Sequence, residues 1–253
     1  IPVDSSYRAI LQKSLKEDKK IPEKFQLISE ISISFAVGRE GNRLLPVKDA
    51  KVYNYLPTEQ PLYLPFLLNA DFVPDASRKS LPSHAWNYAV LKDAGKKFAE
   101  WWASLFTDSN HYNIASIFDL LPDFQAGDKF RDSFMDGFVA RIQEISCIPV
   151  LIGDKLEVRP LKDIIFDKIE LMSGKEPVMT DNWFYSLTNN FFGSLMRYIL
   201  PHPEARRHPK LIKLLEYFAD KDKVGISLSI DAIVGIVSMS SFDTWIVEDT
   251  NAI

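Results

Sequence analysis

The sequence predicts an α+β protein: a small mixed β-sheet with flanking helices, followed by a mostly helical C-terminal region that opens with a β-hairpin. Two patterns predict this fold class. Between residues 27 and 72, short stretches alternate apolar and polar residues, which is typical of half-buried strands. Between residues 83 and 145, apolar residues recur every three or four positions, which indicates helices with one buried face. The chain has 253 residues, of which 46% are hydrophobic, enough for a sizeable core.

The first expected elements are one helix and several short strands. Residues 4–20 are predicted to form an amphipathic helix that Asp4 or Ser5 can cap. A hairpin turn is expected at residues 38–42, where Gly38 and Gly41 lie between apolar stretches. The apolar run of residues 62–72 is typical of a strand covered on both faces, although Pro65 favours a bulge or an edge. Strands are therefore expected at residues 27–37, 43–47, 51–56 and 62–72.

Two long helices are predicted after the sheet. The first covers residues 83–106, with Ser83 as its expected N-cap, and the second covers residues 128–145. Trp101 and Trp102 are neighbours in the first helix. Adjacent helical side chains point about 100° apart, so we expect at most one of the two in the core.

A boundary is expected near residue 146, which divides the chain into residues 1–145 and residues 146–253. The second part is predicted to begin with a hairpin over residues 148–158, turning at Gly153. A loop is then expected at residues 172–179. Helices are expected at residues 183–200, 208–219 and 229–238.

Composition and charge narrow the classes of function. With 30 basic and 34 acidic residues the net charge is −4, which gives no electrostatic reason to expect nucleic acid as a partner. No apolar run reaches the roughly 18 residues of a membrane span. The single cysteine, Cys147, suits a reducing compartment, and we expect a cytoplasmic protein. The chain starts at Ile1 without a signal sequence, and we expect it to be a piece of a longer protein.

Most catalytic signatures are absent from the sequence. It contains no Gly-rich phosphate loop, no dinucleotide fingerprint and no nucleophile elbow, and its four histidines lack metal-binding spacing. Asp154, Glu157 and Arg159 are weakly similar to a magnesium-dependent nuclease site. Such sites require a lysine where Arg159 stands, so an exposed charged hairpin is the favoured explanation of these residues. The basic residues 206–210 are either a solvated loop or a surface for a partner. No metal site is expected.

One arginine is placed where it can reach a phosphate. The apolar strand ends near Phe72, a turn follows, and Ser77, Arg78 and Lys79 come before the next helix. An arginine on a short loop beside a buried strand can present a planar, permanently charged guanidinium to phosphate oxygens. The alternative is an ordinary surface turn in which Arg78 pairs with Asp75 or Asp71.

A family resemblance favours the phosphate interpretation. The segments Leu64–Phe72, Ser77-Arg78 and Trp86-Asn87, together with residues 31–37 and 55–58, resemble the region that follows the nucleotide-binding lobe in sacsin-type proteins. These proteins are relatives of the ninety-kilodalton heat-shock chaperone, in the ATPase group that includes gyrase. The resemblance is specific over residues 27–90.

The resemblance implies a transducer-like domain over residues 1–145 and a role for one loop. Arg78 would be the catalytic residue that reaches the ATP γ-phosphate, and Ser77 would position the turn and belong with Arg78 to the nucleotide-binding set. Lys79 stands where the chaperone has an acidic residue. The lobe's own motifs, an Asn-bearing helix and an Asp-x-Gly-x-Gly loop, do not occur here. ATP with Mg²⁺ is therefore expected in the full-length parent, and no cofactor in this chain.

Two functions stay open at this stage. In the first, the chain is the middle segment of a chaperone-like ATPase: it completes the ATP site of the preceding lobe and relays nucleotide state to the helical region 147–253. The isolated chain is then expected to be inactive. In the second, it is a non-catalytic interaction module whose aromatic helices and residues 206–210 bind a protein partner. Expected partners are the preceding lobe and a protein client, without membrane or nucleic acid.

Overall fold

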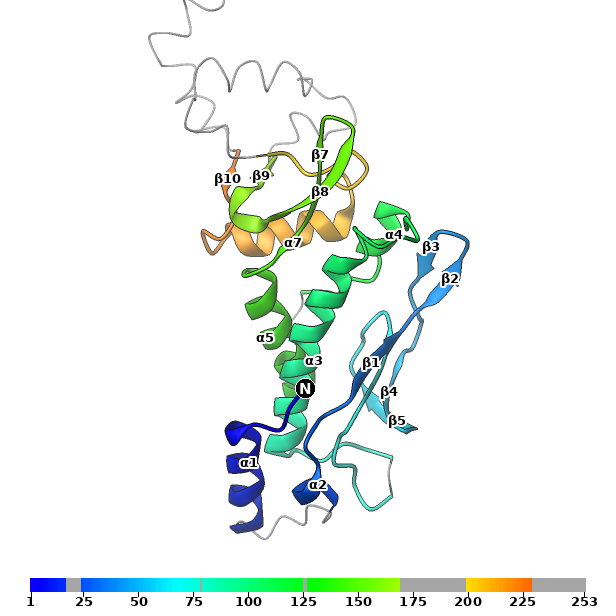
Figure 1. Cartoon of the computed structure of the whole chain (residues 1–253), viewed down its shortest axis with the longest axis vertical. Coiled ribbons are helices and arrows are strands. Elements are labelled where there is room, and N and C mark those ends of the chain that lie inside the picture. The colour runs from blue at the N-terminus through cyan, green and yellow to red at the C-terminus, as the bar shows by residue number, and fades with distance from the viewer. Residues whose placement is uncertain (17–23, 78, 125–126, 169–198, 229–253) are drawn as a thin grey trace, which may run out of the picture. The chain divides into compact units, whose positions relative to one another are not determined.

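The chain forms two compact units, Ile1–Cys147 and Ile148–Ile253. The computed structural model describes residues 1–16, 24–77, 79–124, 127–168 and 199–228, and Figure 1 shows their helices and strands. Both element types occur in the first unit, where a small mixed sheet lies beside helices. The predicted α+β class is therefore confirmed.

The first unit is built on a four-stranded sheet with the strand order β1-β6-β4-β5. β6 is antiparallel to β1 and parallel to β4, and β4 is antiparallel to β5. The parallel strands β4 and β6 therefore end at the same edge of the sheet, where antiparallel β1 begins. The strands are β1 (Ile33–Ala36), β4 (Lys51–Asn54), β5 (Leu56–Pro61) and β6 (Leu67–Ala70).

Three strand predictions need correction. Residues 29–31 are not part of β1, because they hydrogen-bond to residues 1–3 instead, as in Val3 N–H to Ser29 O at 2.8 Å. The single strand expected at residues 51–56 is divided, because Tyr55 reverses the chain with a φ of 62°: β4 ends at Asn54 and β5 begins at Leu56. The run 62–72 contributes only Leu67–Ala70 as a strand, and Tyr63 within it adopts a φ of 50°.

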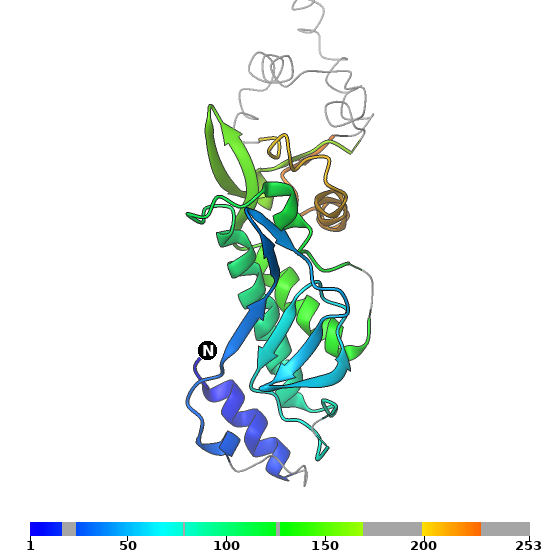
Figure 2. The same ribbon diagram turned by 90° about the vertical axis from the view of Figure 1, so that its right-hand side faces the viewer.

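Two helices cover one face of the sheet. These are α3 (Ala85–Ser104) and α5 (Lys129–Ile142), and Figure 2 shows the strands of the first unit with both helices behind them. Asp128 caps α5 by accepting a hydrogen bond from Arg131 N at 2.9 Å. The N-cap of α3 is His84, whose Nδ1 accepts from Trp86 N at 3.0 Å, so the expected cap at Ser83 is wrong by one residue.

The core of the first unit is aromatic. Phe66 of the sheet side stacks on Phe98 of α3 with ring centroids 4.2 Å apart. Trp102 is fully buried and donates its indole N–H to Ile117 O at 2.9 Å. Its neighbour Trp101 is half-buried and stacks on Phe35 of β1. The expectation that only one of the two tryptophans is a core residue is confirmed.

Smaller elements complete this unit. Asp4 caps α1 (Ser5–Lys16) by accepting hydrogen bonds from Ser6 N and Tyr7 N. The short helix α2 (Lys24–Leu27) follows. The predicted hairpin is confirmed, but its turn is shorter than expected: residues 38–40 form the strand β2 (Gly38–Glu40), which pairs with β3 (Arg43–Leu45) around Gly41, whose φ is 60°. The short α4 (Ile114–Phe118) was not expected from the sequence.

The second unit contains the predicted hairpin and one of the predicted helices. β7 (Ser146–Ile152), which begins at the boundary between the units, and β8 (Lys155–Pro160) form the hairpin. α7 (Pro209–Ala219) matches the helix expected at residues 208–219. The other elements among the described residues of this unit are η1 (Leu161–Asp163) and the parallel pair β9 (Ile165–Phe166) and β10 (Ile226–Ser227). The expected loop at residues 172–179, the expected helix at residues 229–238, and residues 183–198 of the helix expected at 183–200 lie outside the described residues.

α3 and α5 approach so closely that two glycines are required between them. A Cβ added at Gly95 would overlap the carbonyl oxygen of Phe134, and one added at Gly137 would overlap that of Lys92. Both carbonyl oxygens belong to helix backbone, which cannot move out of the way as a flexible side chain can. The helix spacing therefore depends on these two residues.

We predict that Gly137→Ala destabilises the protein by about 1–3 kcal/mol, the usual cost of overpacking. At a helix position with free space around it, the same change stabilises the protein by up to about 1 kcal/mol. The sign of the change in stability therefore shows whether the two helices are in close contact here. Thermal unfolding followed by circular dichroism measures it. Asp136→Ala, at the exposed neighbouring position, is the matched control, and an unchanged or higher Tm for Gly137→Ala would contradict the close approach.

Candidate functional site

The candidate site is the loop of residues 73–82, which joins β6 to α3 and which we call the 73–82 loop. Its two ends are anchored in the core, since Val73 and Leu81 are both buried. The residues around its apex, Ser77 and Lys79, are exposed. Arg78, the expected catalytic residue, lies outside the described residues, so the site is described through the residues on either side of it.

The carboxylate of Asp75 organises the apex of the loop. It accepts hydrogen bonds from the hydroxyls of Ser77 and Ser80, each at 2.9 Å, and from Lys79 N at 3.0 Å. The backbone closes the same turn, with Asp75 N donating to Ser80 O at 3.0 Å. Desolvation by itself raises the pKa of Asp75, but the hydrogen bonds from Ser77 and Ser80 outweigh it and hold the pKa below its ordinary value.

Ser77 holds the turn from both sides of position 78. Its hydroxyl donates to Asp75 and also accepts from Lys79 N at 3.3 Å. The hydroxyl therefore bridges Asp75 and Lys79, which come before and after Ser77 and Arg78 in the sequence. These contacts are of the kind expected for a residue that positions the turn, whereas contact of Ser77 with a nucleotide stays a prediction.

Asn87 ties the two ends of the loop together. It is completely buried in α3, and its side-chain amide pairs with both backbone groups of Val73: Oδ1 accepts from Val73 N at 2.8 Å, and Nδ2 donates to Val73 O at 2.9 Å. Nδ2 also donates to Pro82 O at 3.1 Å. One side chain thus fixes the first and last residues of the loop.

Trp86 anchors the strand end from which the loop departs. Its indole N–H donates to Asp71 O at 2.8 Å. The ring is fully buried and packs edge-on against Tyr7 and Phe25, with centroids 5.2 and 5.4 Å away. The sequence pair Trp86-Asn87 is therefore a structural support for the 73–82 loop, a role that sequence reasoning did not assign to either residue.

The loop is also attached to β5. Glu59 N donates to Lys79 O at 2.6 Å, and the Lys79 ammonium lies 3.7 Å from the Glu59 carboxylate. Both side chains are about two-thirds exposed or more, so this ion pair contributes little to stability. Glu59 thus supplies an acidic partner to Lys79.

The two carboxylates that could neutralise Arg78 in an ordinary turn already accept hydrogen bonds from other groups. Asp75 serves its own loop, as described. Asp71 accepts from Ser32 N at 2.7 Å and from the Tyr55 hydroxyl at 3.0 Å. Both carboxylates therefore have structural roles among the described residues, and a pairing of either with Arg78 stays a prediction.

The other sequence candidates do not form a chemical site in the described part of the chain. Glu157 pairs with Arg159 at 2.8 Å on the hairpin. Within the described residues, no three His, Cys, Asp or Glu side chains are grouped so as to hold a metal ion. Nor is any helix there both long and apolar enough to cross a membrane.

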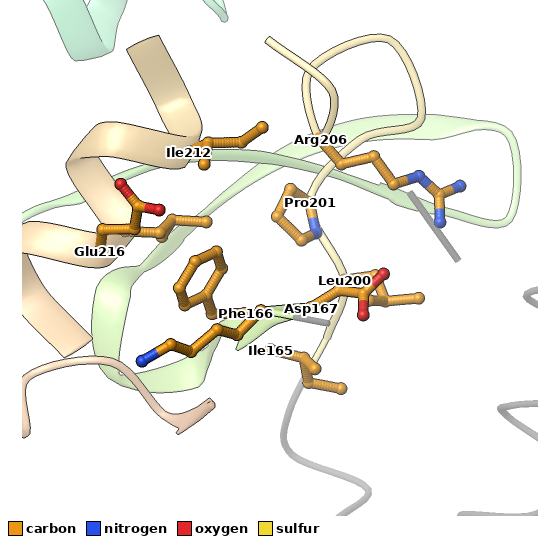
Figure 3. A pocket seen from close by; sticks show the side chains of 10 residues that line it. Ile165, Phe166, Asp167, Leu200, Pro201, Arg206, Ile212 and Glu216 are labelled. Carbon is orange, nitrogen blue, oxygen red and sulfur yellow. The ribbon is translucent and has the colours of Figure 1, made fainter. Parts of the chain in front are cut away.

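The basic residues before α7 lie beside a small pocket in the second unit. His208 caps α7 by accepting from Lys210 N at 3.2 Å. Arg206 lines the pocket together with Asp167 and Glu216 (Figure 3). Its volume of about 70 Å³ is well below the ~300 Å³ of typical ligand pockets. The remaining lining residues are Ile165, Phe166, Lys168, Leu200, Pro201, Ile212 and Leu215.

Several of the large aromatic side chains of the two long helices are core residues. Trp86, Phe98 and Trp102 of α3 have no exposed surface, and neither has Phe138 of α5. Tyr88 and Trp101 of α3 are only partly buried, and binding of a protein partner by these helices stays a prediction.

No protein-family model matches the chain, and no curated protein or solved structure is similar to it. The 73–82 loop and its supports are therefore interpreted from their geometry and from the sequence resemblance over residues 27–90.

We predict that Asn87→Ala loosens the loop. The change strands the buried N–H and C=O of Val73, which costs about 1–3 kcal/mol for each unsatisfied group. Hydrogen exchange of the Lys79 and Ser80 amides should accelerate more than exchange of amides in α5. Asn110→Ala, at an exposed asparagine, is the control. Equal protection of the loop amides from exchange in Asn87→Ala and wild type would show that the hydrogen bonds of Asn87 are not needed to hold the loop.

Proposed function

We propose that this chain is the transducer-like middle segment of a sacsin-type, chaperone-like ATPase, and that Arg78 completes an ATP site held by the preceding domain of the same protein. The observation that carries the proposal is the construction of the 73–82 loop. Its ends are clamped by Asn87 and its apex is ordered around Asp75. In the sequence, position 78 comes between Ser77 and Lys79, which are both exposed.

Such a loop suits electrostatic catalysis because the hydrogen bonds that support it form when the protein folds. A charge that is already held in place stabilises a transition state without reorganisation at the moment of reaction. The buried amide of Asn87 and the carboxylate of Asp75 restrict the loop before any nucleotide binds. This rigidity is the property that a phosphate-contacting arginine needs.

In the proposed reaction a water molecule attacks the γ-phosphate, and the guanidinium of Arg78 stabilises the charge that develops on the phosphate oxygens. Arginine suits this role because its planar fork binds two oxygens and never loses its charge. ATP with Mg²⁺ and the catalytic base belong to the preceding domain. The isolated chain therefore does not hydrolyse ATP in this proposal.

The remaining parts of the proposal concern the cellular setting. Nucleotide state is relayed to the region of residues 147–253, which acts on a protein client. The protein works in the cytoplasm: its single cysteine, Cys147, is fully buried, and burial raises the pKa of the thiol. A buried, protonated lone thiol suits a reducing compartment.

We predict that Arg78→Ala in the full-length protein lowers ATP turnover by about a thousandfold, the lower range for an arginine at a γ-phosphate. KM should change little, since the preceding domain holds the nucleotide. Steady-state ATP hydrolysis measures both. Arg78→Lys should recover only part of the rate, because an ammonium keeps the charge without the fork.

Lys79→Ala is the matched control, since it removes the adjacent exposed cation. It should keep turnover near the wild-type value. Wild-type turnover in Arg78→Ala would contradict the proposal and favour the non-catalytic interaction module.

A further inference from the structure

Three of the four histidines accept a hydrogen bond from the backbone N–H of the second residue after them. The acceptor is Nδ1 in each case: His84 accepts from Trp86 N at 3.0 Å, His202 from Glu204 N at 3.2 Å, and His208 from Lys210 N at 3.2 Å. A ring nitrogen that accepts a hydrogen bond carries no proton. Each of these imidazoles is therefore neutral in this structure, and protonation of Nδ1 would break its bond.

Two of these histidines stand at the two ends of one compact turn, residues 202–208. His202 O accepts from Ala205 N at 2.8 Å and from Arg206 N at 3.0 Å, and His208 N donates to Ala205 O at 2.8 Å. On one side, His202 N ties the turn to β7 by donating to Pro149 O at 2.7 Å. On the other side, His208 is the N-cap of α7. The turn therefore joins the β7–β8 hairpin to α7.

The histidines of this turn can be reached by protons from solvent. His202 and His208 are half-buried, whereas the side chain of His84 is only 6% exposed. Protonation of a buried imidazole places a charge in the core and is strongly disfavoured. Of the three sites, the turn of residues 202–208 is thus the one where mild acidification can act on the folded protein.

The pKa of His202 is lower than the ordinary value for histidine, which is about 6.5. Burial is the largest cause; the charge of Glu204 raises the pKa, and the charge of Arg206 lowers it. Because the pKa is lowered, the unfolded chain takes up a proton more readily than the folded turn does. The stabilisation that His202 provides is therefore complete above about pH 6.5 and is lost as the pH falls below that value.

A proton on His208 meets the positive end of a helix. Its Nδ1 caps the first turn of α7, where the helix dipole makes added positive charge unfavourable. The neighbouring residues in the sequence include the basic Arg207 and Lys210. Charged groups also lie beside the turn where Arg206 lines the small pocket, from the end of β9 and from α7: Asp167, Lys168 and Glu216.

We propose that the turn of residues 202–208 is a proton-sensitive joint, in which proton uptake by His202 and His208 releases the start of α7 from the β7–β8 hairpin. Each proton removes one hydrogen bond of the turn and adds one positive charge beside the basic residues 206–210. Mild acidification therefore makes this segment both looser and more basic. The joint requires neither ATP nor Arg78, so it is independent of the proposed function.

Hydrogen exchange of the amides of residues 202–212 in the full-length protein tests the joint. Protection from exchange is measured at pH 7.5 and at pH 5.0 and corrected for the intrinsic pH dependence of exchange. We expect wild-type protection to be about tenfold lower at pH 5.0, which is the order expected for the loss of a helix cap.

The matched variant replaces both histidines with asparagine, as His202→Asn with His208→Asn. An asparagine side chain accepts the same kind of backbone hydrogen bond and does not titrate, so protection should be equal at the two pH values. His202→Ala with His208→Ala removes both acceptors and should show low protection already at pH 7.5. His111→Asn, at the exposed fourth histidine, should behave like wild type.

Two results would overturn the joint. The first is equal wild-type protection of residues 202–212 at pH 7.5 and pH 5.0. The second is a loss of protection in the double asparagine variant as large as that in wild type, because another residue would then be the titrating group. If the double alanine variant did not fold, the comparison of wild type with the asparagine variant would still decide between the outcomes.

Discussion

The contact between α3 and α5 is the constraint on which the first unit depends. Gly95 and Gly137 let the two helix backbones meet, and this fixes α3 against the aromatic core through Phe98. The same helix begins with Trp86 and Asn87, which hold the end of β6 and both ends of the 73–82 loop. One rigid helix therefore links the packing of the core to the geometry of the candidate site.

The site edge combines buried supports with exposed tips. Asn87 is inaccessible to solvent, whereas the loop apex and Tyr55 are exposed. The backbone conformation of Tyr55 is unfavourable, and it persists because tertiary contacts and hydrogen bonds hold it in place. Burial of apolar side chains in the core offsets its cost in free energy. The proposed role of the 73–82 loop uses this arrangement, in which buried side chains hold an exposed loop in place.

Residue spacing predicted the fold class and the long helices well, because Phe130, Phe134 and Phe138 recur on one buried face of α5. It failed at Tyr55 and Tyr63, whose positive φ angles run against the preference of tyrosine and depend on tertiary contacts. For the site, the sequence identified the turn around Ser77. It did not predict the role of Asn87 in holding the loop. Asn87 bonds to Val73, fourteen residues away, and local sequence patterns do not specify which distant residues the fold brings together. The close approach of the two helices at Gly95 and Gly137 was not predicted either, because glycine inside a helix ordinarily only lowers the stability of that helix.

The most direct test of the central claim is the affinity of the full-length protein for ADP with aluminium fluoride, a mimic of the phosphoryl group in transfer, measured by calorimetry in wild type and Arg78→Ala. An arginine that acts on the transferring phosphoryl group binds this mimic more strongly than it binds ADP. We expect Arg78→Ala to lose affinity for the mimic by about a thousandfold and to bind ADP alone as wild type does. Equal affinities of the two proteins for the mimic would contradict a role of Arg78 at the γ-phosphate.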